Sequence, residues 1–224
     1  LSAHFDTLLG ITEDELQSTF AQQITEMAEE YDVSKEDMLI KLKRQFDGYH
    51  FSRRMRGVYN PFSILRAFKE MLIDDYWFKT GSPTYLVRLL AHSDENINEL
   101  VGKYYPTKDF DDYKATVERP LPMIYQSGYL TIKGWSRNTN SYLLDFPNDE
   151  VRRGFISLLA ADYLKPKVSP DSWVLQVIEA LGKGECKKLH QLMVSFFASI
   201  PYSQRRKDDE REKERYFQYT FYLV

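Results

Sequence analysis

The sequence predicts a mainly α-helical fold with one β-hairpin near residues 129–146. Capping residues precede several amphipathic runs whose apolar positions recur with the period of a helix, while a single segment has the pattern of paired strands. The hydrophobic content of 43% and the charged content of 28% are those of a globular domain. We therefore expect a folded chain built mostly from packed helices.

Two helices are predicted in the first part of the chain. Thr12 and Glu15 form a Thr-x-x-Glu capping box, and we expect one helix from there to about residue 30. Ser34 is the predicted N-cap of a second helix, which Gly48 ends. The side chains expected to face inward are Leu16, Phe20, Ile24 and Met27 in the first helix and Met38, Leu42 and Phe46 in the second.

A proline opens the third predicted helix. Pro61 suits the first helical position, and Asn60 before it is a good N-cap. Residues 49–59 are then a loop. The expected core stripe of this helix consists of Phe62, Leu65, Phe68 and Leu72.

The middle of the chain combines helices with the hairpin. The Ser-Pro pair at 82–83 opens a further helix, and residues 94–105 and 120–127 are expected to be helical. Residues 129–132 and 142–144 are predicted as paired strands joined by a polar turn. A helix followed by strand, turn and strand is the outline of a winged-helix unit.

The last part of the chain is again predicted to be helical. Asn148 caps a helix that Pro166 ends. Residues 170–181 and 185–199 then form the two helices of an αα-hairpin. The charged run RRKDDEREKER at 205–215 alternates in sign, which favours a solvated helix face or a linker.

The composition of the chain limits the classes of protein to which it can belong. With a net charge of −3, the chain as a whole has no electrostatic footprint for nucleic acid, and only a local basic patch would provide one. The single cysteine, Cys186, allows neither an intrachain disulfide nor a Cys-rich metal site, so a reducing cytoplasm is the predicted setting. No apolar run has the length of a transmembrane span, and we expect no membrane among the partners.

The chain lacks the patterns of familiar catalytic sites. It contains no Gly-x-x-x-x-Gly-Lys-Ser/Thr loop to hold phosphates. Its histidines are scattered without metal-ligand spacing, and the adjacent carboxylates at 74–75 and 111–112 would point apart on a helix. We therefore predict no catalytic residues and no metal ligands in this chain.

Several short motifs together resemble one bacterial family. The most specific are GITEDEL (10–16), FDGYHF (46–51), VYNPFSIL (58–65), YWFKTGSPTYL (76–86), YQSGYLTI (125–132) and LLDFPNDEVRRGF (143–155). As a set they resemble AAA-ATPase-like proteins that carry a PD-(D/E)XK nuclease-like domain at the C-terminal end. The resemblance implies a helical lid and winged-helix-like region over 1–155 and a helical connector over 156–203. A charged linker and the first helix of the nuclease-like domain would follow over 204–224.

The resemblance also implies a nucleotide-facing edge beside the loop between the second and third helices. In related ATPases, a proline that opens a helix beyond the nucleotide-binding core packs near the adenine, and Asn60-Pro61 looks like its counterpart. The edge would consist of Asp47, Tyr49, Asn60 and Pro61, although helix ends and helix capping account for these residues equally well. The basic residues of the loop are Arg53, Arg54 and Arg56. They would contact phosphate, of a nucleotide or of nucleic acid, or else form ordinary solvated surface.

Two classes of function stay open. By resemblance, the chain is a regulatory lid fragment of an ATP-binding, nuclease-linked protein, which is not catalytic by itself and whose other parts bind ATP and Mg²⁺. Its partners would be the ATPase core and the nuclease-like domain, or a second copy of the chain through the aromatic residues at 216–222. The alternative is a non-catalytic protein-interaction module or a winged-helix nucleic-acid-binding module. Both ends of the chain look cut from a longer protein.

Overall fold

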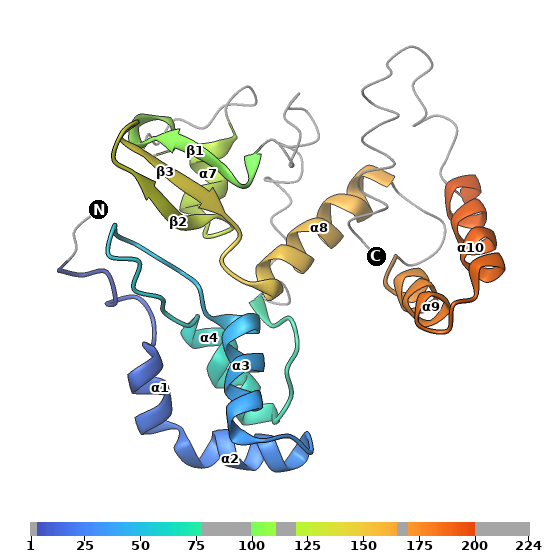
Figure 1. Ribbon diagram of the computed structural model, residues 1–224, viewed down its shortest axis with the longest axis horizontal. Helices are drawn as coiled ribbons and strands as arrows, with labels where there is room; N and C mark the ends of the chain where they lie inside the picture. Colours follow the sequence, from blue (N-terminus) through green and yellow to red (C-terminus); the bar gives the residue numbers. More distant parts are fainter. Residues whose placement is uncertain (1–3, 78–99, 111–119, 165–169, 200–224) are drawn as a thin grey trace. The chain divides into compact units, whose positions relative to one another are not determined.

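The computed structural model describes residues 4–77, 100–110, 120–164 and 170–199 (Figure 1). The chain divides into two compact units, Leu1–Gly154 and Phe155–Val224. The described residues are mainly helical, and a small antiparallel sheet accompanies the helices. The predicted mainly α class is therefore confirmed. The helix predicted to begin at residues 82–83 and the charged run at 205–215 lie outside the described residues.

The first unit begins with a helical part. Its helices within residues 4–77 are α1 (Glu13–Thr19), α2 (Ala21–Glu30), α3 (Lys35–Phe46) and α4 (Pro61–Glu70). The predicted caps at Thr12, Ser34 and Asn60 are all present. The single helix expected up to residue 30 is wrong, because the chain leaves helical geometry at Phe20. There the Phe20 ring stacks on the Phe68 ring, with 5.2 Å between their centroids, so a tertiary contact accompanies the break.

The capping box of α1 leads to a stability prediction. The Thr12 side chain accepts the Glu15 N–H at 3.3 Å, and the Thr12 N–H donates to the Glu15 carboxylate at 2.9 Å. We expect Thr12→Ala to lower the free energy of unfolding by about 1 kcal/mol, measured by urea titration followed by circular dichroism. Thr25→Ala is the control, because the Thr25 hydroxyl bonds only to the Ala21 carbonyl within α2. An equal loss in both variants would contradict the capping role.

The core of the helical part lies between α2, α3 and α4. Its fully buried side chains include Ile24, Met27, Met38, Leu42, Phe46, Tyr59 and Ile64. The stripe predicted for α4 is wrong apart from Phe68, because Phe62, Leu65 and Leu72 are nearly half exposed. The buried face of α4 is made instead by Ser63, Ile64, Ala67 and Phe68. This helix is apolar on more than one side, so packing against α2 and α3 selects the buried face.

The second part of the first unit is a three-stranded antiparallel sheet in the order β1-β3-β2. Its elements are α7 (Leu121–Gln126), β1 (Lys103–Pro106), β2 (Thr131–Ser136) and β3 (Ser141–Asp145), with a short 3₁₀ helix, η2 (Thr107–Asp109), after β1. The predicted hairpin and the helix before it are confirmed. The helix expected over 94–105 is wrong at residues 103–105, which pair with β3 as a third strand. An irregular register between Ile132 and Gly134 leaves Lys133 without a strand partner.

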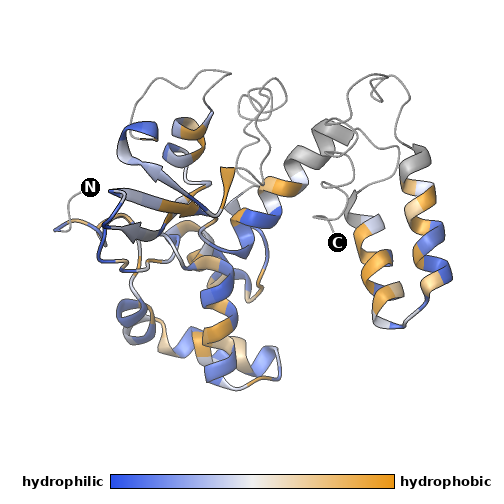
Figure 2. Cartoon of the chain, turned by 45° about the horizontal axis from the view of Figure 1, so that its top comes forward, coloured by the Kyte–Doolittle hydropathy of each residue, from blue (hydrophilic) through white to orange (hydrophobic). Residues whose placement is uncertain are grey.

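The second unit contains the predicted pair of helices. These are α9 (Pro170–Gly182) and α10 (Cys186–Ser199), and α8 (Asp149–Leu164) runs across the boundary between the units. Trp173 joins α9 to α10, because its ring stacks on Phe196 at 4.3 Å and its Nε1 donates to the Leu192 carbonyl at 2.9 Å. In Figure 2, α9 is largely hydrophobic along its length. No described helix combines the length and the apolar character needed to cross a membrane.

Candidate functional site

A cavity of about 450 Å³ lies in the first unit, where the loop after α3 meets the segment between β3 and α8. Both signs of charge occur on its walls. The lining residues are Lys43, Arg44, Asp47, Gly48, His50, Lys133, Asp145, Phe146, Pro147, Asn148, Asp149 and Arg152. The cavity therefore joins side chains from α3, β2 and the start of α8, which are far apart in the sequence.

Hydrogen bonds from buried side chains hold the two edges of the cavity together. The Lys133 ammonium donates to the carbonyl oxygens of Gly48 at 3.0 Å and Pro147 at 2.7 Å. Burial lowers the pKa of Lys133. The Asn148 amide donates to the Asp47 carbonyl at 2.9 Å, while its side-chain oxygen accepts the Val151 N–H at 3.0 Å and caps α8. One strand bulge and one helix cap thus fix the loop after α3.

Two polar side chains on the wall have an atom that is not hydrogen-bonded. Asp47 is only 8% exposed, and its Oδ1 has no hydrogen-bond partner among the described residues. Burial raises the pKa of Asp47, whereas a bond from the Gly48 N–H and the charge of Lys43 oppose that rise. The Nδ1 of His50 is also buried without a partner in this part of the chain, and burial lowers the pKa of His50. These atoms leave hydrogen-bonding capacity unused at the cavity.

The cationic side chains at the cavity differ in how they are paired. Lys43 lies 3.0 Å from the Glu13 carboxylate, and Arg44 lies 2.5 Å from that of Asp149. Arg152 is exposed and forms no ion pair with any residue that the structure describes. With Lys133, these groups give the cavity four cations, against the three carboxylates of Asp47, Asp145 and Asp149. Among the described residues, Arg152 is the cation whose charge is not already used in a contact, so it is the side chain best placed to bind an anionic group. No group of three or more His, Cys, Asp or Glu side chains among the described residues could hold a metal ion.

The predicted nucleotide-facing edge is only partly brought to this cavity. Asp47 lies on the wall. Tyr49 and Asn60 contact each other through a side-chain hydrogen bond, and burial raises the pKa of Tyr49. The Asn60 side chain also accepts the Phe62 N–H at 3.0 Å, with Pro61 as the first residue of α4. Tyr49, Asn60 and Pro61 therefore form a capping cluster beside the cavity without lining it.

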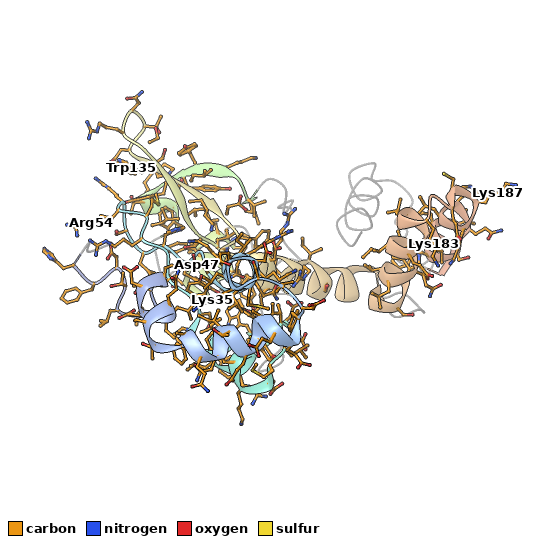
Figure 3. The ribbon with its side chains drawn as sticks, turned by 60° about the horizontal axis from the view of Figure 1, so that its bottom comes forward. Lys35, Asp47, Arg54, Trp135, Lys183 and Lys187 are labelled. Carbon is orange, nitrogen blue, oxygen red and sulfur yellow. The ribbon has the colours of Figure 1, made fainter. Side chains whose placement is uncertain are left out.

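The three arginines of the loop lie elsewhere. The Arg53 guanidinium lies 3.8 Å from the centre of the Trp135 ring, and its Nε donates to the Tyr142 hydroxyl at 2.9 Å. Arg54 and Arg56 are exposed. Figure 3 shows Arg54 and Trp135 near the hairpin, whereas Asp47 lies nearer the middle of the first unit. Arg53 therefore packs on the sheet, and none of the three arginines lines the cavity.

Of the residues that line the cavity, the sequence alone indicated only Asp47 as a site residue. The missed residues that matter most are the cations Lys43, Arg44, Lys133 and Arg152, together with His50 and Asn148. Asn148 was recognisable only as a helix cap, and Arg152 looks like any exposed helix residue. Lys133 had a detectable signal, because a lysine interrupts an apolar strand directly after Ile132. A charged residue at such a position indicates a bulge or a buried polar contact.

A buried glutamate supports the start of α8 behind the cavity. The Oε1 of Glu150 accepts the Ser63 hydroxyl at 3.0 Å and the N–H groups of Tyr76 at 2.7 Å and Trp77 at 2.9 Å. Glu150 is fully buried, and its Oε2 has no hydrogen-bond partner among the described residues. Burial raises the pKa of this carboxyl group. Glu150 therefore connects α8, α4 and the segment that leaves α4.

Comparison with known proteins gives one distant relative. The chain is 26% identical over 227 residues to a protein described as an uncharacterised protein in the vnfD 5′ region of Azotobacter chroococcum mcd 1. The similarity covers 99% of this chain and 41% of that protein, so the chain spans about two fifths of the relative's length. No model of a protein family and no solved structure matches the chain.

Proposed function

We propose that the chain is the lid and winged-helix-like region of a longer AAA-ATPase-like protein with a nuclease-like domain. In this proposal it regulates the use of ATP in the cytoplasm and does not hydrolyse ATP alone. The cavity carries the proposal, because its four cations and its buried Asp47 lie where the loop after α3 is fixed to the hairpin. A group that a neighbouring domain places in the cavity would contact both the loop after α3 and the hairpin.

The chemistry of the cavity supports a phosphate more than it supports a metal ion. Arg152 provides a charged donor for an anion at the rim, and Lys43 and Arg44 add positive charge there, although each also pairs with a carboxylate. Within the described residues no set of carboxylates and histidines could hold Mg²⁺. We therefore infer that Mg²⁺ and the phosphate-binding loop belong to the rest of the longer protein, and that this chain adds cationic side chains to the bound nucleotide.

The winged-helix-like description rests on local order along the chain. α7 is followed at once by β2 and β3, and β1 adds a third strand beside β3. A helix with an attached small sheet supports such a unit, and its use for packing against an ATPase core fits the proposal. A nuclease-like domain and a second copy of the chain are further partners in this scheme.

The test compares this chain with the product of its whole gene. Purified chain should release no phosphate from ATP above a buffer blank, whereas the whole product should hydrolyse ATP. In that product Arg152→Ala should lower kcat/KM about tenfold, because it removes a charged contact worth about 1.4 kcal/mol.

The control variant is Lys69→Ala, which removes an exposed lysine of α4 that forms no ion pair with a described residue and does not line the cavity. It should leave kcat/KM unchanged. A gene product without nucleotide binding, or hydrolysis of ATP by the isolated chain, would overturn the proposal. An equal effect of Arg152→Ala and Lys69→Ala would show that the cavity has no part in it.

A further inference from the structure

Cationic side chains gather at the end of the sheet where β2 turns into β3. Pro106, Ser141 and Ser136 lie in one row across the three strands, because Ser141 pairs with both of the others. Lys108 follows Pro106 by two residues, and Arg137 follows Ser136 directly. Since neighbouring strands lie about 5 Å apart, these two cations stand at the same end of a narrow sheet.

The loop between α3 and α4 brings Arg53 to this end of the sheet. Arg53 packs on Trp135, which precedes Ser136 in β2, and so brings the tip of the loop to the hairpin. The tip is shaped by a turn in which the Met55 N–H donates to the Ser52 carbonyl at 3.2 Å. Arg56 lies in the exposed part that follows. Arg53 therefore holds the loop to the hairpin, and the exposed Arg56 follows it by three residues in the same loop.

Positive charge at this end is not balanced by ion pairs. Arg56, Lys108 and Arg137 are exposed, and none of them forms an ion pair with a described residue. Among the described residues, the acidic groups close by in the chain are Asp6, which is buried and accepts the Ser52 hydroxyl, and Asp109, which is partly buried. Asp111 and Asp112 come next in the sequence and lie outside the described residues. Three arginines elsewhere in this unit, Arg44, Arg66 and Arg153, are ion-paired, whereas Arg152 at the cavity is not paired with a described residue.

We propose that this basic turn end, made of Arg53, Arg56, Lys108 and Arg137, binds the phosphate backbone of a nucleic acid duplex. The cations come from three separate segments and are spread over an exposed edge, which suits successive phosphates better than one small anion. Asn138 and Asn140 in the exposed turn add neutral polar groups of the kind that contact phosphate. The proposal uses none of the residues of the cavity, so its test is independent of the function proposed above.

The test measures binding of a fluorescein-labelled DNA duplex to the chain by fluorescence anisotropy over a series of salt concentrations. The dissociation constant should rise steeply with salt. The triple variant Arg56→Ala/Lys108→Ala/Arg137→Ala should weaken binding at low salt by at least about tenfold. It should also reduce the slope of log K against log salt by about 2 to 3. Circular dichroism should show unchanged helix content, because all three side chains are exposed.

A second triple variant controls for net charge. Lys35, Lys41 and Lys69 are exposed lysines of α3 and α4 without ion pairs among the described residues, and changing them to alanine removes the same charge. This control should bind the duplex as the unchanged chain does. Absence of duplex binding at low salt, or equal weakening in both triple variants, would overturn the proposal. Binding to vesicles of phosphatidylserine and phosphatidylcholine without duplex binding would overturn it as well and indicate a lipid surface instead.

Discussion

Gly48→Ala should lower the free energy of unfolding of the first unit by about 3 to 5 kcal/mol. Gly48 has a φ of +99°, which side chains other than that of glycine rarely tolerate. A Cβ there would overlap the Pro147 carbonyl oxygen and would lie 2.8 Å from the Lys133 ammonium. The variant therefore strains the backbone and disrupts the contact that holds the loop after α3 to the hairpin.

Amide hydrogen exchange resolved by peptide is the measurement, because it reports on the first unit separately. The matched control is Gly102→Ala, since Gly102 has a φ of +70° but its Cβ would meet nothing within 4 Å. That variant should cost only about 1 kcal/mol for its backbone conformation. If Gly48→Ala lowered the free energy of unfolding no more than Gly102→Ala, the close approach of Gly48 to Pro147 would not contribute to stability.

Glu150→Ala should lower the free energy of unfolding of the same unit by about 3 kcal/mol. The change removes an acceptor shared by two backbone N–H groups, those of Tyr76 and Trp77, and by the Ser63 hydroxyl. Each buried donor left without a partner costs about 1 to 3 kcal/mol, and release of a buried carboxyl group offsets part of the sum. Loss of exchange protection should therefore be largest in α4 and in the residues that follow it.

Asp149→Ala tests whether a neighbouring acid has the same weight. The Asp149 side chain is 26% exposed and pairs with Arg44, whose side chain is 78% exposed, so its loss should cost no more than about 1 kcal/mol. Equal effects at the two positions would contradict the special role of Glu150.

The pH dependence of Glu150→Gln follows from the direction of the pKa shift. Burial raises the pKa of Glu150 in the fold above its ordinary value of 4.5. Its contribution to stability is therefore fully present below that value and is lost as the pH rises through the folded-state pKa. The stability of the unchanged chain relative to Glu150→Gln should fall as the pH is raised from 4.5. A difference that is independent of pH, or one that grows with pH, would mean that Glu150 does not titrate as its burial implies.

Helix-capping rules predicted well where the helices begin. Thr12, Ser34, Asn60 and Asn148 each cap a helix in the structure as their positions before amphipathic runs suggested. A cap depends on a side chain and on backbone N–H groups only two or three residues away, so it is contained in the sequence. The same holds for the hairpin, whose strands and turn are contiguous.

The buried faces of helices, the break between α1 and α2 and the pairing of distant strands were predicted less well. The buried face of α4 was misplaced because that helix is apolar on several sides, and only its neighbours select Ile64 over Leu65. Strand β1 was missed because it is stabilised by pairing with residues about forty positions later, as in Lys103 with Leu144. The break at Phe20 likewise coincides with a contact to a ring from another helix, that of Phe68.

The candidate site shows the same division. The sequence by itself determined a mainly helical chain, the pairing of β2 with β3, the helix start at Asn60 and Pro61, and the absence of a phosphate-binding loop motif from this sequence, but not the third strand. Only the tertiary structure decided that Asp47 and His50 share a cavity with Lys133 and Arg152, and that Arg53 belongs to the hairpin. The physical reason is that capping and periodicity act over a few residues. A cavity and a basic surface, by contrast, require side chains that lie far apart in the sequence and meet only when helices and sheet have packed.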